Sequence, residues 1–323
     1  MSAGGGRQRV PAAWAGERLD RSLAAHLGLP RNRVQAWVRA GRVLLDGLPA
    51  GKSGQLLRAG QELAWEAPAP VEDRLVAEPG ELVLLYEDRD LLALDKPAGL
   101  VVHPGAGRPT GTLVHRLLAR FPELAGVGGP GRPGIVHRLD QGTSGVLVVA
   151  RNAGTYHRLV RLFAQRRIDK RYLAIVWGAP ARARGEIEAP VGRHPRERKR
   201  MAVVASGRPA RTGWRVLAAA GPVALVELRL WTGRTHQIRV HLRHLGHPLV
   251  GDPVYGEARW RNLRGPAAAA LASFPRPALH AWRLAFEHPA DERPLRLEAA
   301  VPADLVDLWR AATGLVLPPL PRE

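Results

Sequence analysis

Short apolar runs joined by few residues restrict the fold of this chain more than any other feature of its sequence. The runs are rich in leucine, valine and isoleucine, which favours strands of a buried sheet. Two lie around an aspartate-rich turn in LVLLYEDRDLLALDKPAG, residues 82–99, and the others lie at 145–150, 171–178 and 223–231. Helical patterns lie at 111–120, 155–166 and 303–312. Because helices and strands do not alternate regularly and many connections are as short as hairpins, we expect an α+β domain with a mainly antiparallel sheet.

Two further details of this domain are predicted. In the helix at 155–166, Leu159, Val160 and Phe163 should lie on one apolar stripe. The alanine-rich tract PAAAALAS, which begins at residue 266, is interpreted as a surface insertion.

A smaller unit at residues 9–66 precedes this domain. Leu19, Leu23 and Leu27 recur every four residues, as on one face of a helix. A second helix is predicted at 32–39 and ends before a glycine, as helices often do. The segments VLLDG and QELAW that follow are typical of short strands.

The remaining segments are expected to flank or connect the two units. Residues 1–8 are glycine-rich and are predicted to be disordered. Residues 67–81 are rich in proline and acidic residues and are interpreted as an interdomain linker. The larger domain then spans 82–313, and 314–323 form a C-terminal tail.

The charge of the chain indicates its kind of partner. Lysine and arginine number 48 against 29 acidic residues, a formal net charge of +19, which favours a polyanion such as nucleic acid. A membrane surface is the alternative, but no apolar run approaches 18 residues and no secretory signal opens the chain. The absence of cysteine excludes disulfides, a thiol nucleophile and a cysteine-built zinc site. We expect a cytoplasmic protein that handles nucleic acid.

The segment GRPGIVHRLDQGTSGVLVVARN, residues 131–152, is the most informative in the chain. Its glycine- and proline-rich loop leads to Asp140 and then into a buried strand. A carboxylate in such a loop can act as a nucleophile or base. An isolated aspartate more often caps a turn, here through Thr143 and Ser144. Asp140 alone therefore does not decide between chemistry and structure.

Several motifs in order resemble the RluA/RluD family of RNA pseudouridine synthases. HRLD followed by TSG resembles the family's nucleophile motif, and KRYLA at 170–174 its strand with a central tyrosine. LWTGRTHQIRVHL at 230–242 and HPLVGDPVYG at 247–256 resemble the motifs that follow, and GRHPRERKRMAV and LHAWRL are also similar. The N-terminal pattern RLDRSLAAHLGLPRNRVQAWVRAGRVLLDG resembles an S-four type RNA-binding module, a small α/β unit.

This resemblance implies an isomerase that converts uridine in RNA to pseudouridine. Asp140 is implied as the catalytic carboxylate, and Tyr172 as the ring that lies over the target base and assists proton removal. No cofactor or metal is expected, because substrate and product are isomers. Whether Asp140 attacks the sugar, attacks the base or removes a ribose proton stays open.

An ionised carboxylate beside bound RNA requires a nearby cation, because desolvation alone would raise its pKa. The family pattern places Arg234 near the nucleophile, and we expect Arg234 to pair with Asp140. Arg239 and Arg138 are the other candidates. Because the target uridine must be turned out of its stack, Arg138 is also expected to fill the vacated space.

Basic residues near these motifs and in the N-terminal unit are predicted to bind RNA. The run RHPRERKR at 193–200 is interpreted as a hairpin that contacts phosphates, with a disordered charged loop as the alternative. The predicted RNA-contacting residues are Arg138, His137, Arg239, Arg198, Lys199, Arg200, Arg31, Arg33, Arg39, Arg42 and Lys52.

The motifs leave the substrate and some alternatives open. Their combination is most similar to the RluD-like branch that acts on large-subunit (23S) ribosomal RNA, with transfer RNA as the alternative. A non-catalytic RNA-binding or ribosome-assembly factor and a nucleoside hydrolase are further hypotheses. The histidines of residues 236–247 lack an acidic partner for a metal site, and GVGGPG and GKS lack the context of nucleotide-binding loops. No membrane partner is predicted, and a monomer is expected.

Overall fold

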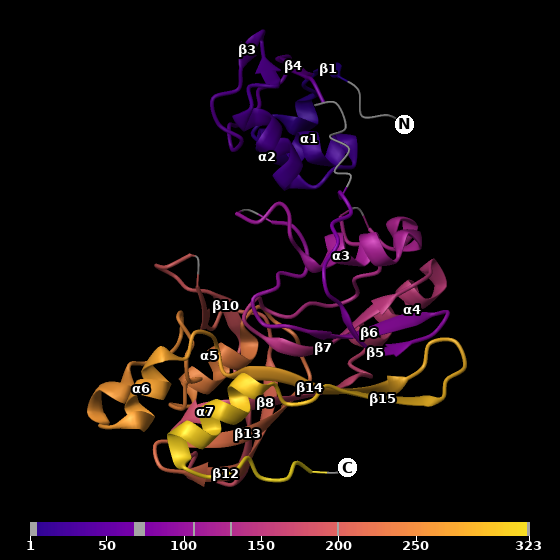
Figure 1. Cartoon of the computed structure of the whole chain (residues 1–323). Helices are drawn as coiled ribbons and strands as arrows, with labels where there is room; N and C mark the ends of the chain where they lie inside the picture. The colour runs from indigo at the N-terminus through magenta and orange to yellow at the C-terminus, as the bar shows by residue number, and fades with distance from the viewer. Residues whose placement is uncertain (1–4, 68–74, 106, 130, 199, 322–323) are drawn as a thin grey trace. The chain divides into compact units, whose positions relative to one another are not determined.

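The computed structural model describes residues 5–67, 75–105, 107–129, 131–198 and 200–321. These residues form two compact units, Met1–Asp73 and Arg74–Glu323. Figure 1 colours the first unit indigo and the second magenta to yellow. Among the described residues, no helix is both long and apolar enough to cross a membrane.

The first unit packs two helices against a small antiparallel sheet with the strand order β1-β4-β2-β3. Its elements are β1 (Gly6–Arg9), η1 (Ala12–Trp14), α1 (Leu19–Leu27), α2 (Arg31–Arg39), β2 (Val43–Leu45), β3 (Leu48–Pro49) and β4 (Glu62–Trp65). Leu19 and Leu23 are fully buried with Val34 of α2 and Leu63 of β4, so the predicted four-residue repeat does face the core. Both predicted helices are confirmed.

The prediction of disorder at residues 1–8 is wrong where the chain is described. Gly6–Arg9 form β1, which pairs with β4 from Gly6 opposite Trp65 to Arg9 opposite Glu62. The glycine is needed there, because a Cβ atom on Gly6 would lie 2.5 Å from the Trp65 ring. Residues 1–4 lie outside the described residues.

The second unit is built on a large mixed sheet in the order β5-β6-β7-β14-β8-β13-β12-β9, with β15 also paired to β14. In its described residues β7 and β14 run parallel, and the other neighbouring strands run antiparallel. Its strands are β5 (Val83–Glu87), β6 (Leu91–Lys96), β7 (Ser144–Ala150), β8 (Asp169–Trp177), β9 (Arg184–Glu188), β10 (Val191–Arg193), β11 (Met201–Val203), β12 (Arg211–Ala220), β13 (Val223–Leu230), β14 (Leu279–Glu287) and β15 (Pro294–Glu298). The predicted α+β class and the mainly antiparallel sheet are confirmed.

Helices cover both faces of this sheet. They are α3 (Leu113–Arg120), η2 (Pro122–Gly126), α4 (Ala153–Ala164), α5 (Gln237–His244), η3 (Arg259–Asn262), α6 (Pro266–Ser273) and α7 (Ala303–Thr313). Successive residues of β8 point to opposite faces. Ala174 and Val176 share a core with Ile238 of α5, whereas Ile175 shares another with Trp309 of α7. Tyr172, two residues before Ala174, therefore lies on the α5 side.

Two predicted details are wrong in this unit. Val160 is 39% exposed, whereas Leu159 on the same helix is fully buried. The buried face of α4 is therefore narrower than the predicted apolar stripe, and it includes Thr155 and Leu159 but not Val160. The tract PAAAALAS is the helix α6, not a surface insertion, since Leu271 is buried against α7 in the core that contains Trp309.

Both segments expected to flank the larger domain contact it. Residues 68–74 of the predicted linker lie outside the described residues. After them, Leu75 packs on the main core, and the Glu78 carboxylate accepts the Gly111 amide at 2.9 Å. In the C-terminal segment, Leu317 and Leu320 pack against the core of α7.

Candidate active site

Asp140 lies in the loop that leads into β7, and this loop is fastened to the strand beside it. His137 Nε2 accepts the backbone N–H of Val148 at 2.9 Å, and its ring stacks on Phe163. Burial lowers the pKa of His137 to about 3, so the ring is a neutral acceptor. The prediction that His137 contacts RNA finds no support in this arrangement, because its ring is used to anchor the loop.

Two buried basic side chains hold the backbone on the other side of Asp140. Lys96, at the end of β6, is fully buried and donates to the carbonyls of Pro97 (2.7 Å), Leu100 (2.9 Å) and Gln141 (3.4 Å). Arg276 donates to the Gly142 carbonyl at 3.2 Å. Sequence reasoning missed both residues. A lysine directly after an apolar strand was the available signal for the first.

The cation that pairs with Asp140 is Arg239. Its Nη1 lies 3.3 Å from Asp140 Oδ2, while its Nε and Nη2 bind the two oxygens of Asp252 at 2.7 and 2.8 Å. Arg239 and Asp252 are each 6% exposed. Burial alone would raise the pKa of Asp252, but the hydrogen bonds and charge of Arg239 outweigh it and lower that pKa. The buried pair fixes the guanidinium that reaches Asp140.

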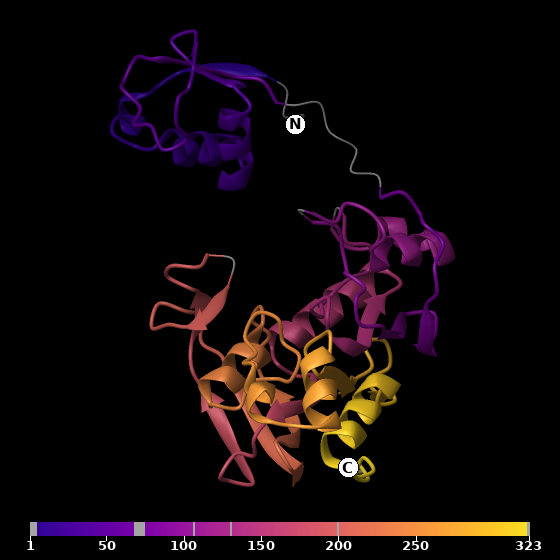
Figure 2. The same cartoon turned by 60° about the vertical axis from the view of Figure 1, so that its left-hand side comes forward.

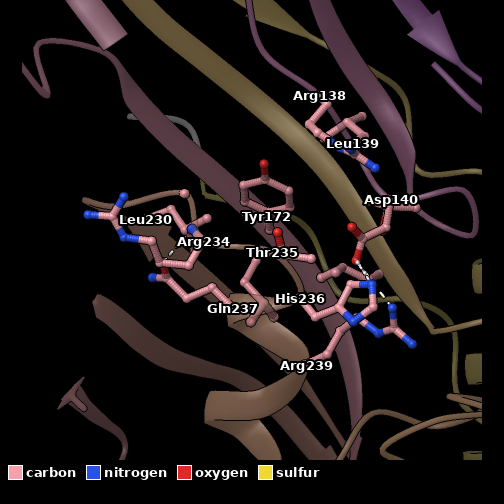
Figure 3. A pocket seen from close by; sticks show the side chains of 14 residues that line it. Arg138, Leu139, Asp140, Tyr172, Leu230, Arg234, Thr235, His236, Gln237 and Arg239 are labelled. Atoms are coloured by element: carbon pink, nitrogen blue, oxygen red, sulfur yellow. Dashed lines mark hydrogen bonds and ion pairs between the residues drawn. The ribbon is translucent and has the colours of Figure 1, made fainter. Parts of the chain in front are cut away.

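The predicted pairing of Arg234 with Asp140 is wrong. Arg234 precedes α5, and its Nε donates to the Pro209 carbonyl at 3.2 Å. Arg239 lies inside α5, in a stretch that is buried from Gln237 to Leu242, and its guanidinium reaches Asp140. Arg234 still lines the cavity that contains Asp140, on another wall, as Figure 3 shows.

Tyr172 and Asp140 line one cavity of about 110 Å³. Tyr172 is 8% exposed, and no hydrogen bond to its hydroxyl occurs within the described parts of the chain. Burial raises the pKa of Tyr172, and the Asp140 charge raises it further, so the ring carries a neutral phenol. An apolar ring face and a free hydroxyl therefore lie beside a carboxylate.

A second, larger cavity of about 750 Å³ adjoins the first. Both are lined by Arg138, Leu139, Asp140, His236 and Arg239. Arg138 is exposed, and it has neither a hydrogen bond nor an ion pair with any described residue. Asp140 thus lies at the junction of a narrow cavity and a wide one.

Comparisons with known proteins agree with this geometry. Residues 90–244 match the family model of RNA pseudouridylate synthase, and residues 17–63 match the S4 domain. An uncharacterized RNA pseudouridine synthase of Chloroflexus aurantiacus is 48% identical, over 92% of this chain and 90% of the relative. The ribosomal large subunit pseudouridine synthase D of Xanthomonas campestris is 44% identical, over 94% of this chain and 91% of its own.

The chain belongs to the RNA pseudouridine synthase family. It is therefore an isomerase that acts on RNA, as the resemblance implied. The solved structure of human RNA pseudouridylate synthase domain containing 4 is also similar, at 29% identity and a TM-score of 0.57, and covers 71% of this chain and 92% of its own.

The other predicted RNA contacts of this synthase differ in their surroundings. The run 193–200 lies in a hairpin of β10 and β11 that projects from the unit (Figure 1 and Figure 2). Arg198 is exposed at its tip, whereas Arg200 is turned inward and donates to Glu197 and to the Val254 carbonyl. Lys199 lies outside the described residues.

The five residues of the S4 domain predicted to contact RNA fall into two groups. Arg31 is bound at 3.0 Å to the buried Asp20, and Arg42 lies 3.7 Å from Glu66. The others are exposed and have no acidic partner among the described residues. They are Arg33, Arg39 and Lys52.

Proposed function

We propose that this synthase isomerises uridine in large-subunit ribosomal RNA, with Asp140 as the carboxylate that acts on the nucleotide. The position of Asp140 carries this proposal. It lies at the junction of two cavities, and Arg239 contacts only its Oδ2. Oδ1 has no partner among the described residues, so one oxygen is free to reach a substrate.

The reaction breaks the bond from the ribose C1′ to N1 of uracil and forms a bond from C1′ to C5. The hydrogen on C5 moves to N1, so no atom is gained or lost. In our proposal the uridine is turned out of its stack, because a stacked nucleotide cannot bring its sugar to a cavity. Tyr172 offers a ring face to the detached uracil and a hydroxyl to its moving proton.

Three neighbouring arginines, of which Arg234 lines the cavity, supply a place for phosphates. Arg234 is close enough to Arg166 and Arg208 that their charges, after burial, lower its pKa. None of the three has an acidic partner among the described residues. Because such a cluster repels itself, a polyanion would relieve it. We assign Arg234 to RNA binding in place of its predicted role beside Asp140.

The choice of ribosomal RNA rests on relatives. The proteins named ribosomal large subunit pseudouridine synthase D from Pseudomonas aeruginosa and Escherichia coli are each 41% identical to this chain over most of its length. In our proposal the S4 domain, residues 9–66, holds the RNA by phosphate contacts, in which Arg33, Arg39 and Lys52 take part.

The test is a modification assay on unmodified transcripts. Large-subunit ribosomal RNA and a set of transfer RNAs are incubated with the protein, and pseudouridine is mapped by chemical labelling and primer extension. We expect new stops in the ribosomal transcript that vanish with Asp140→Asn, which keeps the shape and removes the charge. Stops in transfer RNA alone would overturn the substrate, and an active Asp140→Asn variant would overturn the nucleophile.

A further inference from the structure

His236 is held in a backbone conformation that few residues adopt. It lies at the N-terminus of α5 with φ +56° and ψ +20°, in the left-handed region. This conformation costs free energy for a residue with a side chain, and it persists only where other contacts repay that cost. The contacts of the ring are therefore informative.

The ring of His236 lies between a buried tyrosine and the candidate nucleophile. Its Nδ1 is 2.8 Å from the hydroxyl of Tyr255, and its Nε2 is 3.9 Å from Asp140 Oδ2. Figure 3 shows Nε2 and the Arg239 guanidinium approaching the same carboxylate oxygen. Tyr255 is 2% exposed, so its hydroxyl must find its hydrogen-bond partners within the protein.

The direction of each hydrogen bond follows from the contacts of Tyr255. Its oxygen accepts the backbone N–H of Met201 at 2.8 Å. A phenol has one proton to donate, and among the described residues His236 Nδ1 is the one acceptor within reach. Tyr255 therefore donates to Nδ1. A neutral imidazole that accepts at Nδ1 carries its proton on Nε2.

The surroundings of His236 favour the neutral ring. Burial lowers its pKa; the charges of Asp140 and Asp252 oppose this, and those of Arg239 and Arg138 add to it. A second proton would have to lie on Nδ1, where the Tyr255 hydroxyl already donates. The resting ring is thus a neutral donor with one N–H group aimed at Asp140.

We propose that Tyr255 and His236 are positioning residues for the reaction: the Tyr255 hydroxyl locks His236 as the Nε2–H tautomer, which presents a second N–H donor to Asp140 Oδ2 beside Arg239. With both donors on Oδ2, the free Oδ1 is oriented toward the nucleotide. The gap of 3.9 Å closes when substrate is bound, since catalytic hydrogen bonds often tighten only in the complex. This inference rests on the proposed role of Asp140.

The Tyr255 hydroxyl also connects His236 to the hairpin of β10 and β11. Met201 is the first residue of β11, and the guanidinium of Arg200 lies 5.6 Å from the centre of the Tyr255 ring. The residue directly after the run predicted to contact RNA, 193–200, therefore supplies the N–H that orients the tyrosine.

Two substitutions of His236 separate donor position from backbone strain. In His236→Gln the amide nitrogen replaces Nε2, whereas in His236→Asn it replaces Nδ1. If only the left-handed backbone mattered, asparagine would be the better replacement, because it adopts that region more readily. We expect the opposite order: His236→Gln keeps kcat within about tenfold of wild type, and His236→Asn loses about a hundredfold, the scale of a positioned proton donor.

A readout independent of activity tests the tautomer. In protein labelled with ¹⁵N-histidine, we expect the His236 signals, assigned by their loss in His236→Gln, to show a protonated Nε2 and an unprotonated Nδ1. Tyr255→Phe should mix the tautomers and lower kcat with unchanged RNA affinity. Tyr156→Phe, whose hydroxyl has no hydrogen bond to a described residue, is the matched control.

The outcomes separate this inference from the proposed function. A protonated Nδ1 in the wild type, or His236→Asn at least as active as His236→Gln, would overturn the tautomer lock. An Asp140→Asn variant that still makes pseudouridine would overturn the role of Asp140, and the tautomer measurement would stand unaffected.

Discussion

Arg239 divides one guanidinium between two carboxylates, with Nη1 at 3.3 Å from Asp140 and Nε at 2.7 Å from Asp252. Arg239→Met should abolish pseudouridine formation. It should also lower the free energy of unfolding by about 3–5 kcal/mol, because Asp252 would be left buried and unpaired. Arg239→Lys cannot reach both partners and should not restore activity. The measurements are single-turnover kinetics and urea unfolding.

Arg234→Met is the matched comparison for this prediction. It should weaken RNA binding and reduce its dependence on salt, with the rate at saturating RNA largely kept. A larger loss of saturated rate in Arg234→Met than in Arg239→Met would contradict the assignment of the two arginines.

Tyr172→Phe removes a hydroxyl from the cavity and keeps the ring. Because that hydroxyl has no hydrogen bond to a described residue and lies beside Asp140, we expect it to carry the moving proton. The rate of the chemical step should fall by ~10²-fold or more. RNA affinity, measured by filter binding, should change little. An unchanged rate would reduce Tyr172 to a stacking platform.

Lys96 gives the stability of the fold a specific dependence on pH. Burial lowers the pKa of Lys96 to about 7, against roughly 10.4 in an unfolded chain. Between these values the unfolded state binds more protons, so the contribution of Lys96 to the free energy of unfolding rises with pH. In urea unfolding at several pH values, the free energy of unfolding of the wild type should therefore rise relative to that of Lys96→Met between pH 7 and about 10. A constant difference would mean that the three carbonyls keep the ammonium charged.

Gly145, in the TSG motif, is required by backbone geometry. Its φ is +113°, and a Cβ atom there would lie 2.2 Å from the Ala281 carbonyl oxygen of β14. Gly145→Ala should lower the free energy of unfolding by about 3 kcal/mol or more. Gly126→Ala, where a Cβ atom meets nothing within 4 Å, is the control. Equal urea midpoints for the two variants would contradict this reading.

Much of the local structure could be predicted, because it depends on patterns within a few residues. The helices α1 and α7 follow from helical patterns, and the strands β6, β7 and β8 follow from short apolar runs. The motifs also identified Asp140 and Tyr172 as site residues, and in the structure both line one cavity. Asp140 precedes β7 and Tyr172 lies in β8, two strands that were recognisable from sequence, but β14, which separates them in the sheet, was not predicted as a strand.

The choice between Arg234 and Arg239 could not be made from sequence. It depends on the packing of α5, which buries every residue from Gln237 to Leu242, whereas Arg234 lies before the helix. It depends as well on Asp252, which lies beyond the helix and holds Arg239 through two hydrogen bonds. The prediction that Val160 faces the core was wrong for a similar reason. Apolar residues at helical spacing do not show how wide the buried face of the helix is.

The parallel pairing of β14 with β7, His280 opposite Ser144, has a consequence for how the protein is made. β14 lies between β7, which follows the Asp140 loop, and β8, which carries Tyr172. A ribosome has therefore to deliver residues up to about Glu287 before the two halves of the site can be joined. Contacts over such sequence separations form slowly, after local ones. Catalysis begins only after β14 has been synthesised, and a nascent or truncated chain that lacks this strand has no assembled site with which to modify RNA.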